Sequence, residues 1–474
     1  MRAPVLLSIF LSACGSAASH DIAGGLGSAG AGSSSAGAGA ATAGAGSSSA
    51  GAGAATAGAG SSSAGAGAGT AGAGPSSAGA SSSGGSSGAA SGSGGRSGSG
   101  AAGSGTAGSG SGSGSAGAAG AATLPPHVVG KCDGLAKVGQ WEEITPSGMI
   151  KDPPYEGALM GLVDPNNSGT VYVTTSANGI FKSTDCGSSW KKINTGRNGS
   201  QLDQGKIWSA VLDPAAPNTL YVITGYGPAG LWKSTNGGVD WDDILPKGQG
   251  MPGFVARVSM DPTNHLHLLI NFHDNCTGGH TPVCFGETTD GGKTWAVKDF
   301  PTSLQNQWGE GTFLMPLDEK RWLFEYWDLY FTGDAGKTWK KVDTGGAAGI
   351  QGPYFKAPDG SYWLTSGLGV LTSKDGEHWS TIPNSFGNMD AIVGCGNRLF
   401  SVVGFQPPDG NEFVYSATYS APTKWSALDT PGLPKPMKSG ANSVVCDNDH
   451  NIVYTAAQAG GFWRMVTDAP VKAN

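Results

Sequence analysis

Hydrophobic and polar positions in residues 157–193 follow one another in short runs, which predicts strands rather than helices. The run GTVYVTTS at 169–176 alternates β-branched or aromatic residues with others, as a half-buried strand does. An apolar run at 157–165 precedes it and ends in an Asp-Pro turn, and a third run follows at 179–184. A fourth run, WKKI, begins at Trp190. This segment therefore predicts an antiparallel unit of four strands.

The four-stranded unit recurs along the chain. The third-strand pattern occurs seven times, from GIFKST at 179–184 to GFWRMV at 461–466. A tryptophan at the start of the fourth strand also occurs seven times, at spacings of 49, 51, 54, 44, 40 and 46 residues. Short strands and Gly turns repeating at this interval are typical of propeller blades. The pattern predicts an all-β fold, a single seven-bladed β-propeller of four-stranded blades.

The third-strand pattern and the fourth-strand tryptophan are offset from each other at the ends of the domain. Trp141 begins a fourth strand with no first three before it, whereas 461–466 is a third strand with no fourth after it. If residues 140–145 pair with 461–466, the last blade is completed and no strand edge stays open between the last blade and the first. We expect the ring to close in this way.

A short motif, Ser/Thr-x-Asp-x-Gly-x-x-Trp, lies between the predicted third and fourth strands. Three copies are complete, one has Asn in place of Asp, one is a residue shorter, and the sixth blade has lost the motif. Asp and Ser oxygens accept hydrogen bonds from turn amides, and Gly supplies a positive φ. Each turn offers too few oxygens for calcium. We therefore expect a structural role for its members Asp185, Asn236, Asp290, Asp334 and Asp375.

This motif is the Asp box, or BNR repeat, and the chain from Trp141 to Trp463 resembles Asp-box propellers. The phrases GIFKSTDCGSSW and GLWKSTNGGVDW are most similar to the xyloglucanase and sortilin-type branches of that family. Photosystem-assembly propeller factors and sialidases share the repeat. The resemblance implies that the ligand site lies on the face opposite the boxes. That face would carry the loops between second and third strands and the connections between blades.

Two activities of the resembling proteins do not transfer to this chain. Sialidases hold a carboxylate with three converging arginines, but here Arg321 and Arg398 fall at turns on the opposite face and Arg464 lies within a strand. No Arg-Ile-Pro stands at the start of the domain, so sialidase activity is disfavoured. Xyloglucanases pair two propellers about a cleft. With one propeller here, their two catalytic carboxylates cannot be carried over.

The N-terminus has the pattern of an export signal. Arg2 precedes an apolar run that is too short to span a bilayer as a helix, and the segment ends in Leu-Ser-Ala-Cys at 11–14. These four residues resemble the lipobox of bacterial lipoproteins. The resemblance implies removal of residues 1–13 and attachment of lipid to Cys14. An ordinary signal peptide that contains a cysteine is the alternative.

Residues 14–124 form a tract of Gly, Ala and Ser with a repeated phrase, SSSAGAGAATAGAG. Such a chain cannot bury enough apolar surface to offset its ordering entropy, so we expect a flexible tether. The propeller is assigned to residues 125–474. The formal net charge of −7 argues against nucleic acid or an anionic membrane surface as the main partner. Contact with a membrane is expected through the lipid anchor only.

Six cysteines lie in the propeller region. An even number in an exported domain favours disulfides over metal ligation, and no zinc-type spacing is present, so no metal and no cofactor is expected. Cys276 and Cys284 flank one loop, and Cys395 and Cys446 end the first strands of neighbouring blades. This leaves Cys132 for Cys186. The predicted pairs are therefore Cys276–Cys284, Cys395–Cys446 and Cys132–Cys186, although other connectivities stay open.

The longest loops on the expected ligand face flank the third and fourth blades. A loop at 271–284 presents two histidines and one aspartate, and the next connection and the fourth blade add carboxylates and aromatic residues. Aromatic rings stack on sugar faces, while carboxylates bind hydroxyls or act as acid and base. Candidate catalytic residues are Glu310, Glu325 and Asp274. Candidate ligand-binding residues are His273, His280, Trp308, Tyr326, Trp327, Tyr155 and Tyr226.

Plainer interpretations apply to the same residues. Trp308 and Trp327 can be partly buried between blades, and His273 and His280 can serve only to hold their loop. A metal site formed by the two histidines and Asp274 is disfavoured, because the cysteine pair already explains the loop.

We predict an exported, lipid-anchored monomer on the periplasmic or cell-surface side of a membrane. Its propeller would recognise a polysaccharide or another glycan, or a surface protein, on the face opposite the Asp boxes. The alternative is a glycoside hydrolase, or less favourably a polysaccharide lyase, that uses carboxylates of the third and fourth blades. An assembly factor for a membrane complex is a third possibility, but a long tether fits close docking poorly.

Overall fold

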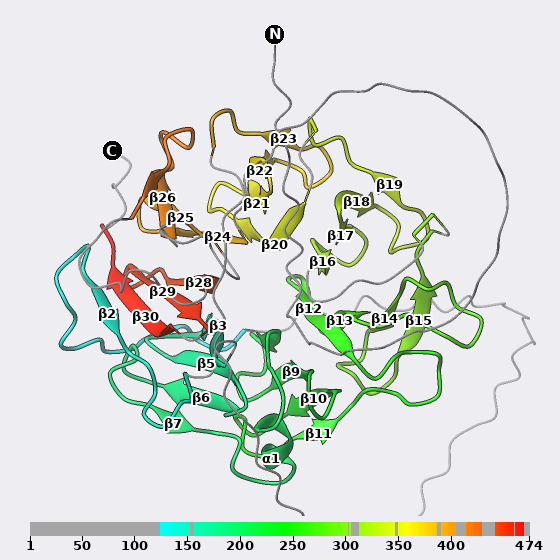
Figure 1. Cartoon of the computed structure of the whole chain (residues 1–474), viewed down its shortest axis with the longest axis horizontal. Coiled ribbons are helices and arrows are strands. Elements are labelled where there is room, and N and C mark those ends of the chain that lie inside the picture. Colours follow the sequence, from blue (N-terminus) through cyan, green and yellow to red (C-terminus); the bar gives the residue numbers. More distant parts are fainter. Residues whose placement is uncertain are drawn as a thin grey trace, which may run out of the picture. The chain divides into compact units, whose positions relative to one another are not determined.

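The computed structural model describes residues 124–151, 156–301, 303–304, 312–346, 349–385, 390–403, 414–428, 441–458 and 460–468. These residues belong to one compact unit. They form seven four-stranded antiparallel sheets arranged as blades around a centre, and one short helix (Figure 1). None of the helical segments within them has the length and apolar character needed to cross a membrane. The predicted all-β, seven-bladed architecture is confirmed.

The first four blades follow one another in sequence. In each blade the strands are given in the order in which they are hydrogen-bonded to one another. Blade 1 is β3 (Gly157–Val163), β5 (Val171–Ser176), β6 (Ile180–Ser183) and β7 (Lys191–Lys192); blade 2 is β8 (Ala210–Leu212), β9 (Leu220–Thr224), β10 (Gly230–Ser234) and β11 (Asp242–Asp243). Blade 3 is β12 (Val255–Asp261), β13 (Asn264–Phe272), β14 (Cys284–Thr288) and β15 (Ala296–Asp299); blade 4 is β16 (Phe313–Pro316), β17 (Trp322–Tyr326), β18 (Asp328–Thr332) and β19 (Lys340–Lys341).

The remaining blades continue in the same way, except that the last takes its outer strand from the start of the domain. Blade 5 is β20 (Ile350–Lys356), β21 (Tyr362–Ser366), β22 (Gly369–Ser373) and β23 (Ser380–Thr381); blade 6 is β24 (Ala391–Cys395), β25 (Arg398–Val402), β26 (Val414–Thr418) and β27 (Ser426–Ala427). Blade 7 is β28 (Ala441–Asp447), β29 (Ile452–Ala457), β30 (Gly461–Val466) and β2 (Trp141–Glu143). Outside the blades are β1 (Val128–Val129), β4 (Asn167–Ser168) and α1 (Gly199–Leu202).

The ring closes between β2 and β30, as the offset of the repeats predicted. Trp141 pairs with Met465 and Glu143 with Trp463, and the Ile144 amide donates to the Phe462 carbonyl at 2.8 Å. Buried Arg464 adds an ion pair with Glu142 at 3.0 Å. The first and last parts of the domain therefore depend on each other for a complete blade.

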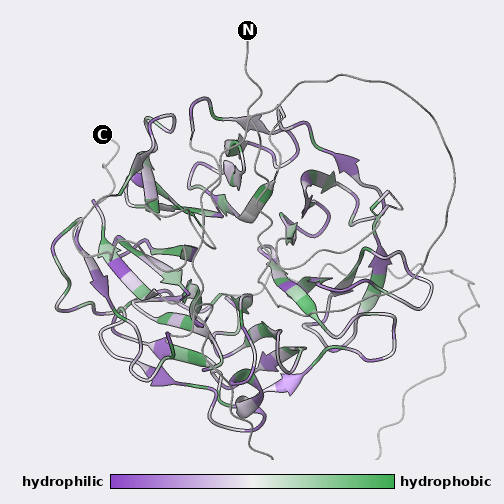
Figure 2. Cartoon of the chain, viewed as in Figure 1, coloured by the Kyte–Doolittle hydropathy of each residue, from purple (hydrophilic) through white to green (hydrophobic). Residues whose placement is uncertain are grey.

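Apolar side chains fill the spaces between neighbouring blades. Phe300, after β15, stacks on Phe324 of β17 with ring centroids 3.9 Å apart, and Phe285 meets Trp322 edge-on at 5.9 Å. Burial of one such side chain stabilises a fold by about 1.5–3 kcal/mol. Figure 2 shows hydrophilic residues on the outermost strands, among them β7 and β19, which are Lys-Lys pairs. Lysines on these edge strands oppose edge-to-edge association.

Side-chain hydrogen bonds hold the repeated turn motif together. In blade 3, Thr288 Oγ1 donates to Asp290 at 2.8 Å and accepts the Gly292 amide at 3.0 Å. Asp290 also accepts the amides of Lys293 and Thr294, each at 2.9 Å. Burial raises the pKa of Asp290, but these hydrogen bonds outweigh it and bring the pKa to about 2. The same pattern of bonds surrounds Asp185, Asn236, Asp334 and Asp375.

Replacement of Asp290 by alanine is expected to lower the free energy of unfolding by about 1 kcal/mol, because two turn amides lose their acceptor. Asp290→Asn is the matched control and should lose less. In blade 2, Asn236 already fills this position and accepts the Asp240 amide at 2.9 Å. Urea unfolding of both variants measures the difference. An equal loss in the two would show that the side-chain acceptor is not what stabilises the turn.

The antiparallel order of strands gives the propeller two distinct faces. Turns between second and third strands lie at one end of the blades, and this end is called the loop face. Turns between first and second strands, and the repeated motif, lie at the other end, called the motif face. The three disulfides are those that the sequence predicted: Cys132–Cys186, Cys276–Cys284 and Cys395–Cys446.

Candidate functional site

Most of the predicted site residues that the structure describes lie on the loop face. Tyr226 is in the turn between β9 and β10, His273 and Asp274 follow β13, and Trp327 joins β17 to β18. Glu325 and Tyr326 end β17, and His280 is in the disulfide loop before β14. Four predicted residues lie outside the described part of the chain: Cys14, Tyr155, Trp308 and Glu310.

Four ring side chains from blades 2 and 3 form what we call the aromatic cluster: Trp208, Tyr226, Phe254 and His273. Phe254 and His273 stack with centroids 4.2 Å apart and planes 8° from parallel. Tyr226 meets Phe254 edge-on at 5.2 Å and lies 5.5 Å from Trp208. Offset-stacked and edge-on contacts of this kind favour a fixed arrangement of rings. The cluster is therefore a preformed aromatic surface.

The backbone around Tyr226 is shaped to bring these rings together. A Cβ atom added to Gly225 would lie 2.1 Å from Phe254 Cε2 and 2.6 Å from Trp208 Cη2, so only glycine fits beneath the rings. Tyr226 itself has a φ of 52°, in the left-handed region that large residues avoid. Backbone conformations of this kind cost of order 1–3 kcal/mol and cluster at functional sites. The turn holds Tyr226 outward, with 37% of its surface exposed.

Polar groups surround the cluster on its solvent side. The Tyr226 hydroxyl lies 3.4 Å from Nε2 of His273, whose Nδ1 lies 2.9 Å from Asp274. The Asp274 side chain is 59% exposed. The ammonium group of Lys206 lies 5.5 Å from the centre of the Tyr226 ring. The rings are thus bordered by a carboxylate and a cation that solvent can reach.

The disulfide loop between Cys276 and Cys284 supports this region. The Thr277 amide donates to the Gly250 carbonyl at 2.9 Å, which joins the loop to the segment before β12. His280 Nδ1 lies 3.1 Å from Asp299 Oδ1, and the Thr281 amide donates to the same oxygen at 2.9 Å. These contacts fasten the loop to β15 and give His280 a structural role.

Glu325, predicted as a catalytic candidate, is inside the domain. Its side chain is 1% exposed, and within the described residues neither carboxyl oxygen has a hydrogen-bond partner. Burial raises the pKa of Glu325 well above its ordinary value, and the charge of Arg257 offsets this only in part. A carboxyl group with a raised pKa can serve as a proton donor, but its burial separates Glu325 from the exposed rings.

A second exposed apolar site lies on the loop face of blades 4 and 5. Trp327 has a φ of 61° and is 52% exposed, so it is not enclosed between blades. Leu368, in the corresponding turn of blade 5, is 53% exposed. Gly349 connects the two turns, because its amide donates to the Trp327 carbonyl and its carbonyl accepts the Gly367 amide, both at 2.9 Å.

Two residues of the aromatic cluster were not predicted from the sequence. Trp208 and Phe254 lie outside the recurring motifs, and nothing in their immediate neighbours indicates that they contact Tyr226. One signal was available. Tyr226 stands between two glycines, Gly225 and Gly227, and a bulky residue flanked by glycines often marks a tight turn that presents a side chain.

The chain was compared with protein families, curated proteins and solved structures. No family model and no curated protein matches it. It is similar to the extracellular domain of a hybrid two-component system from B. thetaiotaomicron, with a TM-score of 0.50 and 12% identity over 70% of this chain and 42% of that one. It is also similar to the GH74 xyloglucanase from Xanthomonas campestris, with a TM-score of 0.49 and 17% identity over 71% and 54% of the two chains.

A third similar structure is that of YCF48 bound to D1 peptide. Its TM-score is 0.46 and its identity 16%, over 70% of this chain and 99% of that one. The chain thus spans about half the length of the xyloglucanase and less than half of the two-component system domain. At these identities the similarity concerns the propeller fold alone.

Proposed function

We propose that the loop face binds a glycan, with Tyr226 and the rings behind it as the stacking surface. The observation that carries this proposal is the exposed Tyr226 in a left-handed turn, backed by Trp208 and Phe254. Sugar rings have apolar faces that stack on such side chains. The turn leaves 37% of Tyr226 exposed beside the rings that pack against it, so part of the tyrosine is available to a ligand.

The polar groups beside the rings support a sugar ligand in preference to an apolar one. Asp274 can accept hydrogen bonds from hydroxyl groups, and the ammonium group of Lys206 can donate them. A largely apolar partner would remove water from both charges without supplying hydrogen bonds of its own, which costs free energy. A protein partner rich in aromatic and polar groups remains the second form of the recognition hypothesis. Trp327 and Leu368 supply an apolar edge for it.

Hydrolysis is the rival activity. The feature in its favour is the burial of Glu325, which raises the pKa of its carboxyl group, since glycosidases need an acid with a raised pKa. They also need a second carboxylate roughly 5–10 Å away across the scissile bond. Because Glu325 is enclosed and Asp274 is exposed on another blade, we place binding ahead of hydrolysis.

One experiment separates binding from hydrolysis. The full chain is incubated with plant, microbial and host polysaccharides, and both retention on the polymer and release of reducing ends are measured. We expect retention without release. Release that is abolished by Glu310→Gln or Glu325→Gln would instead establish a hydrolase.

Tyr226→Ala is expected to weaken retention by about 10- to 100-fold, because a ring buried against the sugar contributes roughly 1.5–3 kcal/mol. The matched control is Leu266→Ala. Leu266 is also exposed, at 38%, but lies on the motif face beside Gly291. Affinity electrophoresis in gels with and without the retained polysaccharide measures both variants. Equal migration of Tyr226→Ala and wild type would rule out this tyrosine as the contact.

The location of the protein is part of the same proposal. We propose that residues 1–13 direct export, that Cys14 carries lipid and that residues 15–124 act as a tether. A long Gly, Ala and Ser segment permits a binding domain to sample a large volume around its anchor. Globomycin-sensitive processing and incorporation of labelled palmitate, both lost in Cys14→Ser, would test the lipid attachment.

A further inference from the structure

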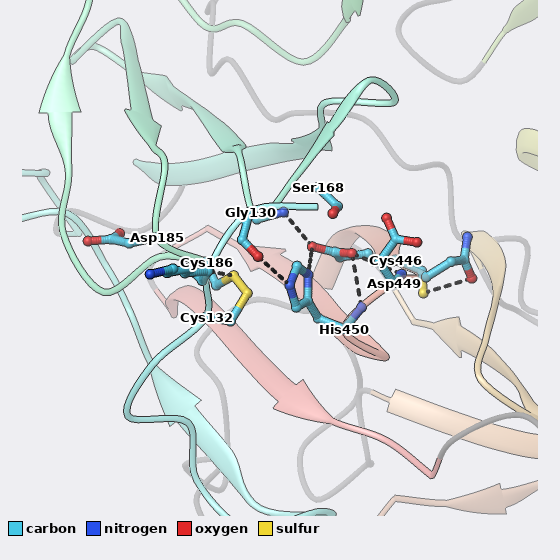
Figure 3. A network of polar contacts seen from close by, with 12 residues as sticks. Gly130, Cys132, Ser168, Asp185, Cys186, Cys446, Asp449 and His450 are labelled. Atoms are coloured by element: carbon cyan, nitrogen blue, oxygen red, sulfur yellow. Dashed lines mark hydrogen bonds and ion pairs between the residues drawn. A yellow bond between two sulfur atoms is a disulfide. The ribbon is translucent and has the colours of Figure 1, made fainter. Parts of the chain in front are cut away.

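Four side chains with metal-binding atoms meet on the motif face, and Figure 3 labels three of them, Cys132, Cys186 and His450. They are Cys132, Cys186, Asp447 and His450, and one ligand atom from each lies within 4.8 Å of all the others. No other group of three or more such residues was found in the described part of the chain. The two sulfur atoms are joined as a disulfide in this structure.

Three separate parts of the chain bring these groups together. Cys132 comes from the N-terminal segment, which is held in place by parallel pairing of β1 with β4. Cys186 is the variable residue of the blade 1 turn motif and is fully buried. Asp447 ends β28 and is 1% exposed, and His450 lies in the turn that follows. The cluster thus lies where the N-terminal segment passes from β1, beside blade 1, to β2 in blade 7.

We propose that reduction of the Cys132–Cys186 disulfide converts this cluster into a site for Zn²⁺. A dithiol reductant supplies two electrons and two protons, the S–S bond breaks, and two thiols form while the dithiol becomes a disulfide. Zn²⁺ then displaces to solvent the two thiol protons and the proton between His450 Nδ1 and Asp447, and it binds both thiolates, that imidazole nitrogen and one carboxylate oxygen. Zinc prefers four such ligands in tetrahedral geometry.

The histidine already has the partner that a metal-binding histidine needs. His450 Nε2 lies 2.9 Å from the Gly130 carbonyl oxygen, which accepts the proton of that nitrogen. Ligating histidines almost always donate their second nitrogen in this way, which fixes the tautomer and the ring orientation. The other nitrogen, Nδ1, lies 2.9 Å from Asp447 Oδ2, where the carboxylate accepts a proton that Zn²⁺ would have to displace. Two ligand atoms of one small ion lie about this far apart.

The backbone of Gly169 orients the carboxylate and lies close to both sulfurs. Asp447 Oδ2 accepts the Gly169 amide at 2.7 Å, which orients the carboxylate toward the cluster. Gly169 has a φ of 82°, and a Cβ atom there would lie 3.1 Å from the Cys186 sulfur and 3.6 Å from the Cys132 sulfur. The backbone conformation and these short distances allow only glycine beside the two sulfurs.

The consequence is a second way of fastening the N-terminal segment. The oxidised chain holds it by a covalent bond, and the reduced chain would hold it by a metal bridge between the same residues. The bridge would form before oxidation or on exposure to thiols. In either state residues 124–132 stay attached to blade 1.

The test uses the full chain, treated with dithiol, freed of reductant without oxygen and titrated with Co²⁺ as a spectroscopic substitute for Zn²⁺. We expect one tightly bound ion with thiolate-to-metal absorption, and an increase in the melting temperature of the reduced chain on addition of Zn²⁺. The oxidised chain should show neither. Cys132→Ser/Cys186→Ser keeps the other cysteines and should lose the absorption.

Two further variants keep both cysteines, so that loss of metal binding can be distinguished from loss of folding. His450→Gln and Asp447→Asn fold in the oxidised state and are reduced afterwards, and each should weaken Co²⁺ binding by at least about tenfold. Equal absorption in Cys132→Ser/Cys186→Ser and wild type would overturn the proposal, as would the absence of tight binding in the reduced wild type. Unchanged affinity in both His450→Gln and Asp447→Asn would equally contradict the four-ligand site.

Discussion

Trp141→Ala is expected to lower the free energy of unfolding by about 3–5 kcal/mol, the cost typical of deleting a buried tryptophan. Trp141 is 2% exposed and packs in a cluster with Trp463, Met465 and Phe400, which come from blades 7 and 6. It also begins β2, the strand that completes the last blade. Alanine there removes apolar contacts and weakens the strand that closes the ring.

The measurement is urea unfolding followed by intrinsic fluorescence and circular dichroism. Trp327→Ala is the matched control, because this tryptophan is 52% exposed and should change stability by no more than about 0.5 kcal/mol. A loss below about 1 kcal/mol in Trp141→Ala would mean that the ring does not depend on the closing strand.

His267→Gln is expected to destabilise the domain by a comparable amount, about 3–5 kcal/mol near pH 6. His267 is 2% exposed, and its Nδ1 lies 2.8 Å from Asp261 and its Nε2 3.1 Å from Glu287. Lys298 forms a further ion pair with Glu287. Glutamine removes the positive charge between two carboxylates, and buried charges without a partner are costly.

The pH dependence of stability gives an independent check on this network. Burial by itself lowers the pKa of His267, but the hydrogen bonds to Asp261 and Glu287 outweigh it and raise the pKa to about 9. The folded state therefore binds a proton more tightly than the unfolded state. This contribution is fully present below the unfolded pKa of about 6.5 and is lost as pH rises through about 9.

The two carboxylates have the opposite dependence. Burial raises the pKa of Asp261 and of Glu287, but the hydrogen bonds from His267, together with those of Thr263 to Asp261 and of Lys298 to Glu287, outweigh it, so each pKa is lowered. Their contribution is present above the unfolded values near 4 and is lost as pH falls further. The wild type should be most stable at about pH 5–6.5.

Urea unfolding at pH 6 and pH 9.5 tests the sign. The wild type should lose stability between these values by an amount of order 2–3 kcal/mol from His267, and His267→Gln should lose much less. His265→Gln is the matched control, since His265 pairs with Asp213 at 2.9 Å but is partly exposed. Equal slopes in wild type and His267→Gln would contradict the assignment of a charged His267.

The fold could be predicted because each blade repeats the same local signals. The seven tryptophans and seven third strands fixed the number of blades, and the offset of Trp141 indicated the partner of β30. The pairing of Cys395 with Cys446 followed from equivalent positions on adjacent inner strands. Features of this kind depend on residues that are close in sequence, or on equivalent positions in two adjacent blades.

The candidate site could be predicted only in part, because it depends on contacts between loops of different length. Tyr226 and His273 were identified, but Trp208 and Phe254, which hold them, were not. Glu325 and Trp327 are two positions apart, yet one is buried and the other exposed. The turn at Trp327 departs from regular alternation, and sequence periodicity gives no information on such a turn.

The aromatic cluster lies on the loop face, and the cluster of Cys132, Cys186, Asp447 and His450 lies on the motif face. The two proposals can therefore be tested without interfering with each other. Tyr226→Ala should leave Co²⁺ binding by the reduced chain unchanged. His450→Gln should leave polysaccharide retention by the oxidised chain unchanged. An effect of either variant on the other site would indicate a general loss of folding, which circular dichroism would detect.

Hydroxyl-radical footprinting of the full chain, with and without the polysaccharide that it retains, tests the central claim most directly. Protection of Tyr226, Phe254 and His273 is expected, because the sugar would cover these side chains. Leu266 on the motif face should be modified equally in both samples. Protection of Leu266 with unchanged modification of Tyr226 would place the glycan on the other face and contradict the proposed site.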